Sequence, residues 1–206
     1  TDEQTVFRLT RAKNHMDKDM VYHPGVETIC GWDFGIAAET ALVWMQLFYI
    51  EQTPANKHGV IINVIDEYTS SNKPASHYAQ VVNDKGYINC THIGDPAGKT
   101  RESDLKTWAI RLREHGLTLH TPRKTSVADM IENANDYMVC LKCNENTTPK
   151  FVEMMENWGY PKDRDGNIKE GSLPNHDNYS HIGTAFYYAI THQFPIKKDS
   201  WGAKVY

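Results

Sequence analysis

The chain has 206 residues, of which 40% are hydrophobic and 23% charged, and its formal net charge is -4. This length suits one domain, which can bury a sizeable core without disulfides. The negative charge does not indicate a nucleic-acid binder, because phosphate contacts favour basic surfaces, but it does not exclude one whose metal site adds carboxylates. Four cysteines, no apolar run of transmembrane length and no signal peptide favour a reducing cytoplasmic setting. Because the chain does not begin with Met, we expect it to be a fragment of a longer protein.

The predicted elements, taken in chain order, indicate an α/β fold. Three strands rich in apolar and β-branched residues come first, and their short connections predict an antiparallel meander. Helices and strands then alternate, which predicts a mixed sheet with helices on both faces. The strands are expected near 27–33, 40–49, 59–68, 87–93 and 117–120, and the helices near 74–86, 102–115, 126–134, 147–158 and 180–193.

Polar segments set the expected domain boundaries. Residues 1–25 are polar and mixed in sign, so we expect a lead-in or linker there. One folded domain is expected over 26–194, followed by a loosely held tail over 195–206. The stretch 160–175 is rich in Pro, Gly, Asp and Lys, which predicts a loop or a hairpin.

A single charged residue, Asp33, stands inside the first apolar strand. Burying a lone carboxylate is unfavourable unless the group is paired or binds a metal ion. We therefore expect Asp33 to be a ligand, and the alternative is a turn aspartate beside Gly35.

Asp95 is the second candidate, because it ends the fourth predicted strand. Ligands in open α/β sheets gather outside the carboxyl ends of strands, and a mixed sheet can bring Asp33 and Asp95 together. Two neighbouring carboxylates repel each other, and a divalent cation relieves that repulsion. Oxygen donors of this kind favour Mg²⁺ or Mn²⁺. The alternative for Asp95 is an ordinary Asp-Pro turn.

Asp177 and His181 form the third candidate group, four residues apart at the start of the last predicted helix. If the helix begins early enough, the two side chains lie on one face. The alternative is that Asp177 only caps the helix, since an acid is favoured at a helix N-terminus.

Three other patterns are expected to be structural. The run 94–100 imitates a phosphate-binding loop, but only three residues separate its glycines where the motif needs four. Cys140 and Cys143 lack a second pair to complete a zinc site, so we interpret them as unrelated thiols on a strand. The run 163–167 begins like a calcium loop without the closing glutamate, which favours a turn.

Arg123 and Lys124 follow a predicted strand, and further cations occur in the last third of the chain. Each is most often a solvated surface residue, but together they could line a phosphate track.

In this order, the motifs resemble the nuclease domain of tailed-phage large terminases, the headful-packaging motors that also cut the viral genome. The resemblance covers roughly residues 25–192. The similar segments are 31–35 with 40–44, 64–68, 93–97, 123–132 and 176–189.

This resemblance implies an RNase H-like fold and two-metal hydrolysis of double-stranded, concatemeric DNA with little sequence preference. It implies that Asp33 bridges two Mg²⁺ or Mn²⁺ ions, that Asp95 holds one, and that a group at the start of the last helix holds the other. The family often has an acid at the position of Thr184, so Asp177 is expected to take that place, with His181 as the other donor. Arg123 and Lys124 are expected to contact DNA.

The resemblance also implies the partners of a packaging motor in the host cytoplasm, without a membrane. These are the ATPase domain of the same full-length protein, the terminase small subunit and the portal protein. One alternative is a catalytically weak or silent docking module that contacts the portal or motor, since position 184 has no acid. The other is an actin-like or sugar-kinase-like ATPase, which needs a second Gly-x-Asp-x-Gly hairpin that the sequence lacks.

Overall fold

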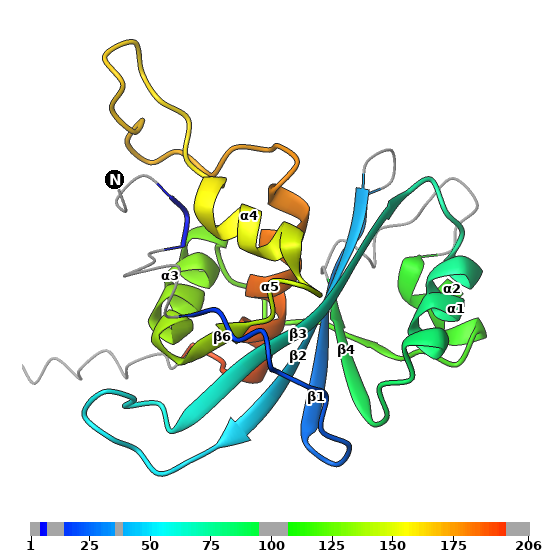
Figure 1. Ribbon diagram of the computed structural model, residues 1–206. Helices are drawn as coiled ribbons and strands as arrows, with labels where there is room; N and C mark the ends of the chain where they lie inside the picture. The colour runs from blue at the N-terminus through cyan, green and yellow to red at the C-terminus, as the bar shows by residue number, and fades with distance from the viewer. Residues whose placement is uncertain (1–4, 8–14, 36–38, 95–106, 197–206) are drawn as a thin grey trace, which may run out of the picture.

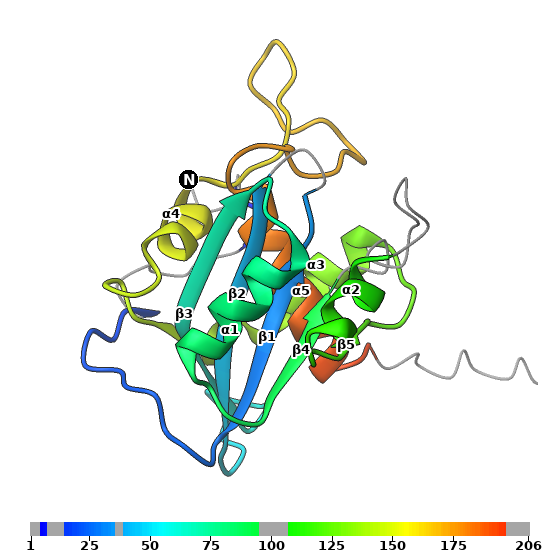
Figure 2. The same ribbon diagram turned by 90° about the vertical axis from the view of Figure 1, so that its right-hand side faces the viewer.

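The computed structural model describes residues 5–7, 15–35, 39–94 and 107–196, and the structural statements that follow concern these ranges. They form one mixed sheet of six strands with helices on both of its faces (Figures 1 and 2). None of the helices in these ranges has the length and apolar character needed to cross a membrane. The strands are β1 (Glu27–Asp33), β2 (Glu39–Tyr49), β3 (Val60–Ser71), β4 (Cys90–Gly94), β5 (Leu119–His120) and β6 (Leu141–Cys143), and the helices are α1 (Ala75–Lys85), α2 (Trp108–Glu114), α3 (Val127–Tyr137), α4 (Pro149–Asn157) and α5 (Ser180–Gln193).

The sheet has the order β5-β4-β1-β2-β3-β6, and its pairings confirm the predicted fold class. Strands β1, β2 and β3 form the antiparallel meander. Strand β4 then joins β1 in parallel, β5 joins β4 in parallel, and β6 joins β3 in parallel. In this register Asp33 lies opposite Ala41, and Trp32 lies beside Gly94. The carboxyl ends of the parallel strands β1 and β4 therefore lie side by side at the same end of the sheet.

Several predicted boundaries differ from the structure. The third strand runs on to Ser71, and the fifth begins at Leu119. The fourth strand begins at Cys90 rather than at Tyr87, and Asn89 just before it has a φ of 53°, in the left-handed region. A left-handed residue cannot continue an extended strand, so pairing starts after it. The described part of the second helix begins at Trp108, capped by the Thr107 side chain, and the predicted start at Glu102 lies outside the described residues.

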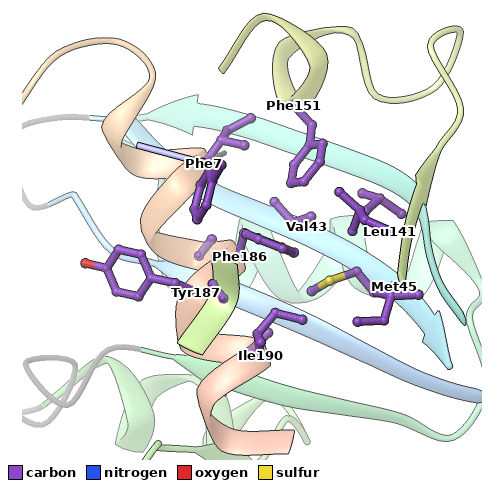
Figure 3. Close-up of a cluster of buried hydrophobic side chains, with 14 of the residues drawn as sticks. Phe7, Val43, Met45, Leu141, Phe151, Phe186, Tyr187 and Ile190 are labelled. Carbon is purple, nitrogen blue, oxygen red and sulfur yellow. The ribbon is translucent and has the colours of Figure 1, made fainter. Parts of the chain in front are cut away.

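The larger hydrophobic core lies between the sheet and helices α3, α4 and α5. Because side chains alternate along a strand, Val43 and Met45 of β2 point into this core, where they meet Phe151 and Phe186 (Figure 3). The opposite face of β2 contributes Trp44 to a smaller core beneath α1 and α2. Since β2 is buried on both faces, it appears in the sequence as an almost unbroken apolar run.

Two glycines allow close packing around α5, one against β1 and one against Trp158 at the end of α4. A Cβ atom at Gly31 would collide with the backbone carbonyl of Ala185. A Cβ atom at Gly183 would collide with the indole ring of Trp158. These contacts fix the height of α5 over the sheet, and with it the position of the first turn of the helix.

Parts of the predicted lead-in pack against the domain. Val6 and Phe7 are buried in the larger core, where the Phe7 ring meets Phe186 edge-on at 5.2 Å. The division into a lead-in, one domain and a tail stays a prediction, and most of the tail lies outside the described residues.

The segment 160–175 contains the short hairpin that the sequence favours, with a bridge between Lys162 and Ile168 (Figure 1). Within it, the Asp163 carboxylate accepts the backbone N–H groups of Asp165 and Asn167, as in a turn.

Candidate functional site

Asp33, the last residue of β1, is the centre of the candidate site. Its Oδ2 atom accepts a 2.7 Å hydrogen bond from Nδ1 of His181, and both side chains are largely buried. The hydrogen bond to the Asp33 carboxylate raises the pKa of His181 above its usual value, although burial acts in the opposite direction. Within the described residues, the N–H of Gly35 bonds to the Thr40 hydroxyl and not to Asp33.

His181 reaches Asp33 because it lies in the first turn of α5, directly over the end of β1. The preceding residue, Ser180, donates its hydroxyl to the carbonyl of Asp177 at 2.7 Å, which orders the entry into the helix. The ring of His176 packs edge-on against the ring of His181 at 5.3 Å. The imidazole is therefore held by its neighbours as well as by Asp33.

Asp177 lies near this pair without contacting Asp33 in the described part of the chain. Its carboxylate accepts the N–H of Tyr179 at 3.0 Å, and its carbonyl accepts the N–H of Ser180. Asp177 therefore forms the turn before α5 and precedes the helix itself, which begins at Ser180. The i, i+4 spacing with His181 does not correspond to one helical face.

A cavity of about 660 Å³ opens beside His181, and we call it the site cavity. Helices α4 and α5 and the neighbouring ends of β2 and β3 contribute its walls. Its lining residues are Glu39, Ser71, Lys150, Glu153, His176, Asp177, Asn178, Tyr179, His181 and Ile182.

Glu39 and Glu153 of the site cavity were missed by the sequence reasoning, and Lys150 was considered only as one of several cations of the last third of the chain that could line a phosphate track. Glu39 opens β2, and Lys150 and Glu153 lie in the first turns of α4. The only signal for Glu39 is its place at the start of an apolar strand that pairs with the strand of Asp33. No comparable signal marks Lys150 or Glu153, because charges at exposed helix starts are common.

Lys150 links the two sides of the site cavity. Its ammonium group contacts Glu39 at 3.0 Å and also the hydroxyl of Thr69. The backbone N–H groups of Lys150 and Phe151 are accepted by the carboxylate of Glu67 at 2.8 and 2.7 Å. Burial raises the pKa of Glu67, and these two hydrogen bonds act in the opposite direction. The carboxyl group of Glu67 therefore occupies the N-terminus of α4.

The remaining predicted site residues lie elsewhere. Asp95 is outside the described residues, although β4 ends at the residue before it, beside Trp32 of β1. Arg123 and Lys124 line a second cavity of about 380 Å³ at the far end of α5, together with Thr191. Thr191 follows His181 by ten residues, which corresponds to roughly 15 Å along the helix. The two cations are thus separate from the Asp33–His181 pair.

The described residues supply part of a metal-binding donor set. A carboxylate oxygen and an imidazole suit Mn²⁺, and carboxylates suit Mg²⁺, so Asp33 and His181 fit such an ion. Within the described ranges, no group of three or more His, Cys, Asp or Glu side chains is close enough to hold an ion. Burial raises the pKa values of the Cys140 and Cys143 thiols to about 11 and about 12.

Solved structures of large terminases resemble this chain over most of its length. The nuclease domain of the large terminase of bacteriophage SPP1, solved with bound Mn, matches it with a TM-score of 0.63 and 20% identity, over 86% of this chain and 95% of that chain. The chain has the RNase H-like fold of a large-terminase nuclease domain. The nuclease domain of the P22 large terminase matches with a TM-score of 0.60 and 15% identity, over 90% of this chain and 95% of its own.

A longer large terminase, from a thermophilic bacteriophage, matches with a TM-score of 0.69 and 14% identity over 91% of this chain. The match spans only 45% of that longer protein, so this chain corresponds to about half of it. No family model and no curated protein matches the sequence. The fold that the sequence motifs implied is therefore confirmed by structural similarity.

Proposed function

We propose that this chain is the metal-dependent endonuclease domain of a viral DNA-packaging terminase, and that it cuts concatemeric double-stranded DNA with little sequence preference. The observation that carries the proposal is the pair formed by Asp33 and His181 at the edge of the site cavity. In the same fold, the SPP1 nuclease domain holds Mn. A nearly buried carboxylate whose titratable partner lines a cavity is typical of a functional site.

The proposed ligands of two Mg²⁺ or Mn²⁺ ions are Asp33, Asp95, Asp177 and His181. The direct contact with Asp33 favours His181 over Asp177 as the principal donor from the start of α5. When bound, the ions would activate a water molecule and stabilise the leaving oxygen of the phosphodiester. The protein contributes a fixed carboxylate and an imidazole whose orientation is set before any ion arrives.

Arg123 and Lys124 are proposed to contact the DNA backbone away from the cleavage point. They line a cavity with Thr191, which lies roughly 15 Å along α5 from His181, a length that spans several nucleotides of a duplex strand. The proposed partners are the ATPase domain of the same full-length protein, the small terminase subunit and the portal protein, in the host cytoplasm. The partial coverage of the longer thermophilic-phage terminase supports a further domain in the natural protein.

The test is plasmid cleavage by this chain in Mg²⁺, Mn²⁺ or EDTA. We expect cutting that requires the ion and that disappears in Asp33→Asn. The matched control is Asp84→Asn, which removes the same charge from the exposed surface of α1. Ion-independent cutting, or equal cutting by Asp33→Asn, would refute the metal site.

The docking module remains the second candidate because position 184 has Thr in place of an acid. Failure to cut with either ion at high protein concentration, with no stabilisation by Mn²⁺, would favour it.

A further inference from the structure

Lys150 provides the one ammonium group among the described residues that line the site cavity. Its side chain is about half exposed, with a relative accessibility of 51%, so it faces the cavity while its two partners hold it in place. One partner is the carboxylate of Glu39, and the other is the hydroxyl of Thr69. An ammonium group carries three N–H donors, so these contacts leave one donor for a ligand.

The charge of the site cavity explains why such a donor matters. Glu39, Glu153 and Asp177 line the cavity, and Asp33 adds a fourth carboxylate behind His181. A DNA phosphate that entered this cavity would meet mainly negative charge. Bound cations and Lys150 are the groups that can offset the repulsion.

The helix N-terminus beside Lys150 cannot serve this purpose. Glu67 already accepts the N–H groups of Lys150 and Phe151, so these two amides of α4 are not available to a phosphate. The same interaction fixes the backbone of Lys150 relative to β3. The lysine therefore has a rigid base and an ammonium group oriented by Glu39, which is the preorganised form of a phosphate contact.

We propose that Lys150 binds a backbone phosphate of DNA in the site cavity, and that Glu39 holds the lysine in position until the phosphate arrives. This inference rests on the proposed function, because it names a residue that holds the substrate at the same site. The chemical class of ligand is a phosphodiester next to the bond that is cut. Lys150 acts as a substrate-binding residue, and Glu39 as a positioning residue.

The experiment measures initial rates of duplex cleavage in Mn²⁺ at several DNA and salt concentrations. We expect Lys150→Met to raise KM about 10-fold, because a charge-assisted hydrogen bond is lost. The slope of log(kcat/KM) against log[salt] is negative, and its magnitude should decrease by about one unit, as for any lost phosphate contact. Lys150→Arg should restore most of the slope, because it keeps the charge.

The matched control is Lys57→Met, which removes an exposed lysine from the loop between β2 and β3, far from the site cavity. It should leave KM and the salt slope unchanged. The stabilisation of each variant by Mn²⁺ is measured in parallel, and Lys150→Met should keep the full wild-type increase in Tm.

The outcomes separate this inference from the proposed function. If the wild-type chain cuts but Lys150→Met behaves like Lys57→Met, Lys150 only neutralises Glu39 and the inference is wrong. If Lys150→Met also loses the Mn²⁺ stabilisation, the lysine supports the metal site and does not bind phosphate. If the wild-type chain does not cut at all, the proposed function fails and this inference fails with it.

Discussion

Each face of the sheet carries a largely buried aspartate, but the two aspartates differ in how many hydrogen-bond partners they have. On the α1 side, Asp66 of β3 accepts hydrogen bonds from Lys85 at 2.5 Å, from the Tyr87 hydroxyl at 2.8 Å and from the N–H of Glu67 at 2.8 Å. On the α5 side, Asp33 has one hydrogen-bond partner among the described residues, His181, which lines the site cavity. The first carboxylate has three partners, and the second keeps more of its acceptor capacity for a ligand.

The histidines that accompany them differ in the same way. His92 accepts the indole N–H of Trp32 at 3.1 Å, and burial lowers its pKa to about 4, with a smaller contribution from His120. His181 donates to a carboxylate, which raises its pKa. Residue types alone therefore do not identify a site. Incomplete pairing beside a cavity distinguishes Asp33 from Asp66.

The largest expected effect is the loss of activity in Asp33→Asn. We expect cleavage in Mn²⁺ to fall more than about 100-fold, because losing even a supporting partner of a metal ligand costs about 10–100-fold. Its Tm should stay close to that of the wild type, since Asn can still accept a hydrogen bond from His181. Full cleavage activity in Asp33→Asn, or failure of this variant to fold, would contradict the contrast drawn between Asp33 and Asp66.

Asp66→Asn should show the reverse behaviour. Removing this charge leaves Lys85 without its ion-pair partner, and we expect the free energy of unfolding to fall by about 2–3 kcal/mol. That corresponds to a Tm lower by about 4–12 °C, measured by calorimetry. Cleavage well below the Tm should match the wild type. A strong loss of cleavage in the folded variant would contradict the assignment of Asp66 as structural.

His181→Ala should reduce cleavage by about 10–100-fold, as expected for a ligand or a close partner of one. Asp177→Asn should have a smaller effect, because Asn still accepts the Tyr179 N–H and Asp177 does not contact Asp33 in the described part of the chain. Parallel cleavage assays at matched protein concentration rank the two. A larger loss of cleavage in Asp177→Asn than in His181→Ala would identify Asp177 as the principal metal donor at the start of α5.

The smallest expected effect is the pH dependence contributed by His92. The pKa of His92 is about 4 in the folded state and about 6.5 in the unfolded state. Between these pH values, the unfolded chain therefore binds a proton at His92 and the folded chain does not. The contribution of His92 to the free energy of unfolding is fully present above about pH 6.5 and is lost as the pH falls toward 4. We expect up to about 2 kcal/mol of loss between pH 7 and pH 5. In urea unfolding, the free energy of unfolding of His92→Gln should depend less on pH than that of the wild type. An equal pH dependence in the two proteins would mean that other groups cause the loss of stability.

The antiparallel meander, the last helix and the position of Asp33 in the first strand could be predicted from the sequence, because a charge in an apolar strand and apolar periodicity are local signals. The roles of Glu39 and Lys150 could not. Each lies at the start of an element, as many charged residues do, and only the β1–β2 register and the approach of α4 bring them to the site cavity. The late start of β4 also depended on a single left-handed residue, Asn89, which composition does not reveal.

The most direct test of this account is the Tm of the wild-type chain with and without Mn²⁺, next to Asp33→Asn and Asp66→Asn. At an ion concentration 100 times Kd, binding to the folded state contributes about 2.7 kcal/mol, which corresponds to an increase of about 5–10 °C. We predict this increase for the wild type and for Asp66→Asn, and almost none for Asp33→Asn. Equal responses of the two variants, or no response of the wild type, would contradict the claim that Asp33 is the metal ligand.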